Sequence, residues 1–241
     1  MFEKLQDQIN RDLKALSTKA KRSVNTGAAA TDALWLSMAA AQIKATGKSL
    51  VIISDTASEA LRLVDEIRYF APELRVDYFP DWETLPYDMV SPHQDLVSER
   101  LEVLYRLVSG SQDRPDVLIS TPTTVAQTIA PPEYLAGRVF FFKKGEEILP
   151  ELLRERLIKA GYSHVSQVVA PGEFSVRGSL IDIFPMGTAE PFRLDLFDNE
   201  IDSIRSFDPD TQRSIASVDE IRILPGREYP VDSDSIVNFR A

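Results

Sequence analysis

Residues 49–54 read SLVIIS, a short unbroken apolar run that is typical of a buried strand. Apolar side chains at helical spacing follow at residues 60–67, so the run predicts a strand that leads into a helix. Residues 76–79 and 116–120 are further strand candidates, with a leucine-bearing helix expected between them at residues 101–107. Strands that alternate with helices predict an α/β domain, in which helices cover a parallel sheet.

Two more helices are expected ahead of this first strand. Residues 33–43 read ALWLSMAAAQI, which is apolar nearly all round and indicates a helix buried between other elements, with Trp35 in the core. The chain also opens with apolar residues at three- and four-residue steps, which predict an amphipathic helix: Phe2, Leu5, Ile9, Leu13 and Leu16.

The pattern changes after Phe142, and we place a domain boundary near Lys143. One short helix, with apolar residues between 152 and 158, precedes several strands that have no helix between them. This order predicts a small α+β domain with an antiparallel sheet and a helix on one side. Its strands are expected at residues 174–177, 180–184, 192–197 and 201–205, with a hairpin turn at Asp198 and Asn199.

Alternation along these strands assigns their side chains to two faces. Phe174 and Val176 share one face of their strand, while Ser175 and Arg177 share the other. On a neighbouring strand Arg193 points away from the apolar residues. Both arginines are therefore predicted on the outward face of the sheet, where a solvated surface is the simplest interpretation.

Composition bounds the function classes. The chain has 241 residues, of which 44% are hydrophobic and 27% charged, as in an ordinary globular protein. It has no cysteine, which excludes disulfides, thiolate zinc sites and cysteine nucleophiles. No signal peptide or membrane-length apolar run occurs, so we expect a cytoplasmic protein without membrane contact. The net charge of −10 disfavours direct binding to nucleic acid.

No catalytic or metal site is predicted. The two histidines, His93 and His164, fall in different expected domains and have no cysteine to complete a metal site. The serine-hydrolase pattern G-x-S-x-G is absent. We therefore expect no catalytic residue, no metal and no cofactor.

Residues 24–31 (VNTGAAAT) have the position of a phosphate-binding loop ahead of the buried helix, but lack its chemistry. Such a loop needs glycines that cradle phosphate and a lysine that reaches the terminal phosphates. Aligned on Gly27, Ala30 stands where that lysine is required, and only Thr31 is retained. The sequence predicts a degenerate P-loop-type domain that does not bind nucleotide, although a nucleotide-driven helicase or ATPase lobe remains the alternative.

Several motifs resemble the N-terminal region of the bacterial transcription-repair coupling factors (Mfd). Residues 79–88 (FPDWETLPYD) and 91–95 (SPHQD) are similar to this family's first domain. Residues 172–178 (GEFSVRG), 182–185 (DIFP) and 193–198 (RLDLFD) look like the second domain that the family shares with the excision-repair protein UvrB.

The resemblance implies a UvrB-like module of three parts. These are a degenerate nucleotide-binding-type domain 1a at residues 1–142, an inserted UvrA-binding domain 2 at 143–211, and the start of a returning domain 1b segment at 212–241. The implied function is non-catalytic recruitment of the repair protein UvrA to stalled transcription sites. We expect the chain to be part of a longer ATP-dependent DNA translocase, whose remaining domains contact RNA polymerase and DNA.

The resemblance carries three partner-binding residues onto this chain. Arg177 matches the arginine of an R-G pair in the UvrA-binding strand, Phe174 matches its phenylalanine, and Arg193 matches an arginine on the neighbouring strand. Phe174 falls on the opposite face from the arginines, so a core position is an equal alternative for it. The chain departs from the family at Ser175, and at residues 163–164 (Ser-His), where arginines are expected. A weaker or differently centred interface follows from these departures.

Overall fold

The computed structural model describes residues 29–84, 91–110 and 112–230, together with residues 4, 7, 9 and 11. It forms two compact units, Met1–Pro80 with Gly110–Ala126, and Asp81–Ser109 with Gln127–Ala241. Most of the predicted opening helix and the centre of the predicted phosphate loop, with Gly27, lie outside the described residues. The predicted domain boundaries after residues 142 and 211 stay predictions, since the compact units follow a different division of the chain.

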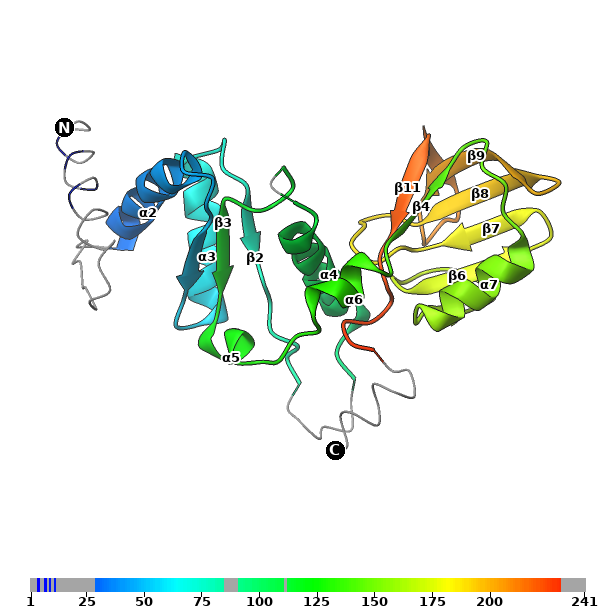
Figure 1. The fold of residues 1–241 in the computed structure, drawn as a ribbon, viewed down its shortest axis with the longest axis horizontal. Coiled ribbons are helices and arrows are strands. Elements are labelled where there is room, and N and C mark those ends of the chain that lie inside the picture. Colours follow the sequence, from blue (N-terminus) through cyan, green and yellow to red (C-terminus); the bar gives the residue numbers. More distant parts are fainter. Residues whose placement is uncertain are drawn as a thin grey trace. The chain divides into compact units, whose positions relative to one another are not determined.

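A three-stranded parallel sheet forms the centre of the first unit. Its strands are β1 (Leu50–Ile53), β2 (Val76–Tyr78) and β3 (Val117–Ser120), and β3 lies between the other two (Figure 1). The register places Leu50 and Val76 on either side of Val117. The predicted parallel sheet is thus confirmed, with strands at the three apolar runs.

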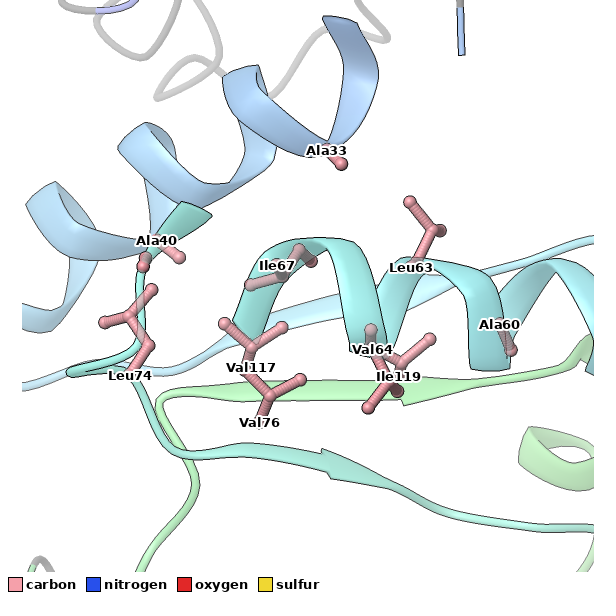
Figure 2. Close-up of a cluster of buried hydrophobic side chains, with 11 residues drawn as sticks. Ala33, Ala40, Ala60, Leu63, Val64, Ile67, Leu74, Val76, Val117 and Ile119 are labelled. Carbon is pink, nitrogen blue, oxygen red and sulfur yellow. The ribbon is translucent and has the colours of Figure 1, made fainter. Parts of the chain in front are cut away.

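Helices α2 (Ala29–Lys44) and α3 (Ala57–Phe70) cover one face of this sheet. α3 begins after Thr56, whose side chain caps the helix by accepting a hydrogen bond from the backbone N–H of Glu59. The apolar stripe of α3 packs with Val117 and Ile119 of β3; in Figure 2 Val64 points toward β3, Leu63 points away from the sheet on the side of α2, and α2 supplies small alanines. Burial of this stripe fixes α3 on the sheet.

Three features predicted for this part of the chain turn out differently. Val51 and Ile53, on the other face of β1, are exposed, so the described helices of the unit cover β1 on one side. The helix expected at residues 101–107 forms as α4 (Gln94–Val108) but belongs to the second unit, where it packs on the short helix α6 (Pro132–Ala136). The helix around Trp35 is confirmed as α2, but its indole is only half-buried.

Asp116, just before β3, ties together three parts of the first unit. Its buried carboxylate accepts hydrogen bonds from the backbone N–H of Arg75 at 2.8 Å and from the ammonium of Lys44 at 3.0 Å. Burial alone would raise the pKa of Asp116, but these two donors outweigh it and hold its pKa below the ordinary value. The charged form therefore stabilises the fold.

We expect Asp116→Asn to lower the free energy of unfolding by about 1.5 to 3 kcal/mol at neutral pH, the range for hydrogen bonds to a charged group. The folded pKa is depressed, so the contribution is present above the unfolded-state value of about 3.9 and is lost as the pH falls through the folded value. Denaturant titrations from pH 7 to pH 3 should show the difference from wild type shrinking below about pH 4. The exposed Asp113→Asn is the control, and a difference that grows with acid would contradict the assignment.

The second unit is built on a six-stranded sheet in the order β10-β9-β8-β7-β6-β5. All neighbours are antiparallel except β5 and β6, which are parallel. The strands are β5 (Ser163–His164), β6 (Glu173–Arg177), β7 (Leu180–Ile183), β8 (Phe192–Phe197), β9 (Glu200–Phe207) and β10 (Ser214–Val218). The predicted hairpin is confirmed, and Asp198 in its turn takes a φ of 56°, which aspartate tolerates better than most residues.

Helix α7 (Pro150–Lys159) packs on β5 and β6 and buries Leu153 and Leu157. A two-stranded antiparallel pair, β4 (Phe140–Lys143) and β11 (Glu220–Ile223), completes the unit. The short helix α5 (Pro122–Val125) lies in the first unit.

A buried ion pair joins α4 to the segment that follows β11. Arg100 and Glu228 are almost fully buried, and their Nε and Oε1 atoms lie 2.5 Å apart. The indole Nε1–H of Trp82 donates to Glu228 at 3.2 Å, and the Arg100 guanidinium lies 5.0 Å from the Trp82 ring centre. Trp82 of the FPDW motif therefore has a structural role, since it donates a hydrogen bond to the buried carboxylate of Glu228.

Candidate partner-binding face

A polar row crosses the outward face of the six-stranded sheet. The register pairs Ser175 with Asp182, Asp182 with Arg193, and Arg193 with Arg205, so these side chains lie side by side on β6, β7, β8 and β9. Alternation along β6 and β8 predicted this face, and the register confirms that Arg193 lies on the same side as Ser175.

Asp182 lies at the centre of the row and is the ion-pair partner of both predicted arginines. Its side chain is 1% exposed. Arg193 forms a two-point pair with it, from Nε to Oδ1 at 2.6 Å and from Nη2 to Oδ2 at 2.9 Å. Arg177 adds a single contact, from Nη2 to Oδ2 at 2.5 Å. Two arginines against one aspartate leave one positive charge in excess at this point of the face.

Several contacts fix the side chain of Arg193. Its side chain is 16% exposed, its guanidinium lies 4.7 Å from the Phe207 ring centre, and its Nη1 donates to the backbone carbonyl of Gln212 at 3.3 Å. The hydrogen bonds to Asp182 raise the pKa of Arg193 further above its ordinary value. Arg193 is therefore a permanently charged and mostly buried part of the face.

Arg177 is the exposed member of the group. Its side chain is 51% exposed, and its contact with Asp182 uses Nη2, one of three guanidinium nitrogens. A shallow hollow of about 620 Å³ lies beside it, lined by Ser166, Gln167, Arg177, Leu180, Arg193 and Gln212. A side chain of a partner that enters this hollow would meet a guanidinium with free donors.

The face is not fully solvated, because residues 165–168 cross part of it. Val165 and Val168 pack against Phe184 and Phe207 on this side of the sheet. Ser175 is buried beneath the same segment, and its Oγ lies 3.4 Å from the carbonyl oxygen of Ser166. The simplest interpretation of this face, a solvated sheet surface, is therefore wrong for Ser175 and Asp182, which are both buried.

The exposed part of the face continues on β8 and β9. Asp195 and Arg205 form a half-exposed ion pair at 3.2 Å. Phe197, at the end of β8, is 75% exposed. Exposed aromatic residues are enriched in protein interfaces, so Phe197 joins the candidates. Alternation along β8 places Phe197 on the same face as Arg193, and an apolar residue on a polar face is the signal in the sequence that could have singled it out.

Phe174 lies in the core of the second unit. It is completely buried, is paired across the sheet with Ile183, and contacts the ring of His164 at 5.1 Å between centres. Phe174 would contact a partner directly only if the core opened. The structure therefore supports the core position of Phe174 rather than the partner contact. The residues Ser163 and His164, which depart from the family pattern, are exposed on the edge strand β5.

Only part of the predicted nucleotide loop lies within the described residues. Ala30 and Thr31 belong to the first turn of α2, but their side chains, like Gly27, lie outside the described residues. Within the described part of the chain, no three histidine, cysteine, aspartate or glutamate residues come together as a metal-binding group. None of the helices described there is long and apolar enough to cross a membrane.

Comparison with known proteins finds a family match within the second unit. Residues 140–229 match the family model of the UvrB interaction domain. This segment contains the whole six-stranded sheet, including the row around Asp182.

The chain as a whole is similar to transcription-repair-coupling factors. It is 45% identical over 192 residues to the protein from Escherichia coli K12, which is 80% of this chain and 16% of that protein. The Haemophilus influenzae protein is 45% identical over 193 residues, and the Bacillus subtilis protein is 32% identical over 228 residues, or 95% of this chain. The chain thus spans 16 to 18% of the length of these relatives. Most of the chain is thus similar to a region of transcription-repair-coupling factors, and residues 140–229 match the UvrB interaction domain.

We expect Phe174→Ala to destabilise the second unit by about 3 to 5 kcal/mol, as truncation of buried aromatic residues does. The matched Phe197→Ala should stay within about 0.5 kcal/mol of wild type, because that ring is mostly exposed. Chemical denaturation followed by circular dichroism measures both. Equal stability losses for the two variants would contradict their placement.

Proposed function

We propose that this chain is a non-catalytic adaptor module that recruits UvrA to stalled transcription sites as part of a transcription-repair-coupling factor. The observation that carries the proposal is the cluster of Arg177, Asp182 and Arg193 on the outward face of a UvrB interaction domain. Arg177 and Arg193 are the proposed contact residues, with Phe197 as an aromatic neighbour. We propose that Phe174 contributes to binding only indirectly, because its buried ring stabilises β6, the strand that carries Arg177.

Charge supports an acidic partner surface. The chain carries a net charge of −10, yet this cluster has an excess positive charge and an exposed guanidinium. Arginine presents a planar fork of donors that suits carboxylates. A local positive site on an acidic molecule selects a complementary acidic patch and rejects a basic one.

The domain organisation and the remaining partners are part of the same proposal. Domain 1a at residues 1–142, the UvrA-binding domain 2 at 143–211 and the returning segment at 212–241 form one UvrB-like module of a cytoplasmic protein. Contacts with RNA polymerase and DNA, and the ATP-driven movement along DNA, belong to other domains of the longer protein.

The alternative function is a nucleotide-driven helicase or ATPase lobe, which the parallel sheet of the first unit favours. The absence of a lysine from residues 24–31 argues against it, because no side-chain cation of the loop would reach the terminal phosphates.

We predict that Arg177→Ala weakens UvrA binding by about 2 kcal/mol or more, in the range of an interface hot spot. Its free energy of unfolding should remain within about 0.5 kcal/mol of wild type, because the side chain is half-exposed. Arg177→Lys should recover part of the loss, since an ammonium keeps the charge but not the planar fork. Arg177→Glu should bind weakest through repulsion of the acidic partner.

Isothermal titration of purified UvrA measures these affinities. Arg154→Ala, which removes an exposed arginine from α7, is the control for loss of charge alone. If Arg177→Glu binds UvrA as tightly as wild type, the outward face is not the interface.

ATP separates the adaptor from the ATPase lobe. A ligand at about 100 times its dissociation constant stabilises a protein by about 2.7 kcal/mol. We expect millimolar ATP with Mg²⁺ to leave the thermal midpoint of this chain unchanged. A clear upward shift would support the nucleotide-driven alternative.

A further inference from the structure

We propose that Asp182 is a positioning residue, which holds Arg193 permanently and holds Arg177 through one nitrogen, so that the other guanidinium donors of Arg177 stay available to a partner carboxylate. This inference rests on the proposed function, because the partner is the acidic surface that Arg177 meets.

The asymmetry of the two contacts carries the inference. Arg193 uses both Nε and Nη2 on Asp182, is 16% exposed, and is further held by Phe207 and by the carbonyl of Gln212. Arg177 makes one contact with Asp182 and is 51% exposed. An incoming carboxylate therefore reaches Arg177 much more easily than Arg193, which exposes only part of its side chain.

Asp182 does not depend on Arg177 to compensate its charge. The Asp182 carboxylate is buried and needs a compensating charge, and the two-point pair with Arg193 supplies one. Arg177 can thus share its guanidinium between Asp182 and a partner carboxylate in the adjacent hollow while the buried pair of Asp182 and Arg193 stays intact.

Asp182 could act on binding in two opposed ways. Its negative charge repels a partner carboxylate, which would slow association. Its hydrogen bond to Arg177 also fixes a long side chain that otherwise loses rotamer freedom on binding. We infer that the second effect dominates, because Arg193 already neutralises most of the Asp182 charge as seen from outside.

The two effects differ in kinetics. Asp182→Asn preserves the shape of the side chain but removes its charge. We expect UvrA to dissociate about tenfold faster or more from this variant, as for loss of one member of a buried charge pair, with association unchanged or faster. Surface plasmon resonance with immobilised UvrA measures both rates. Glu220→Gln, which breaks an exposed pair with Lys143, is the matched control.

The Arg177→Ala background tests whether Asp182 acts through Arg177. In that background Asp182→Asn should change the dissociation rate by less than about twofold, because the two residues then behave as one unit. Equal fold-changes in both backgrounds would overturn the inference. So would slower dissociation of Asp182→Asn, which would make Asp182 a competitor of the partner. The inference would also fail if Asp182→Asn lowered only the fraction of the chain that binds UvrA and left the dissociation rate normal, because Asp182 would then have a structural role alone.

A measurement without UvrA keeps the inference separate from the proposed function. Guanidinium NMR signals of Arg177 should show restricted rotation in the wild-type chain and free rotation in Asp182→Asn, while the fold is retained. If rotation is equally free in both, Asp182 does not position Arg177. If it is restricted as expected but wild type shows no binding to UvrA, the proposed function fails while the pairing stands.

Discussion

One buried carboxylate organises the outward face of the second unit. Asp182 lies at the middle of a row across β6, β7, β8 and β9, where it fixes the side chain of Arg193 and orients that of Arg177. A charge in this position is costly unless it is paired and hydrogen-bonded. The same constraint explains why Arg193 is stacked and bonded on every side, whereas Arg177 remains available to a partner.

The regular parts of the fold were readable from the sequence. The apolar run at residues 49–54 and its counterparts became the parallel sheet, and period-two alternation separated Phe174 from Arg177 correctly. These predictions succeed because strand geometry alone determines which side a residue faces. The arginine positions of the candidate site could be placed on this basis.

The remaining features depend on contacts between distant residues. Nothing in the local pattern indicates that residues 165–168 cover Ser175, or that Arg193 stacks on Phe207. The same holds for Trp82, Arg100 and Glu228, which join a motif, a helix and a segment more than a hundred residues downstream. Asp182 itself was visible only as part of the DIFP motif, because its partners lie on other strands. Sequence alternation therefore finds a face, whereas tertiary packing decides which of its residues are free to bind.

Hydrogen–deuterium exchange of this chain with and without UvrA tests the central claim most directly, since it maps the interface without substitutions. If the outward face binds UvrA, added protection should appear in peptides that cover β6 to β8 and residues 165–170, while the strands β1 to β3 of the first unit remain unchanged. Protection confined to the first unit, or unchanged exchange at saturating UvrA, would contradict the assignment of this face.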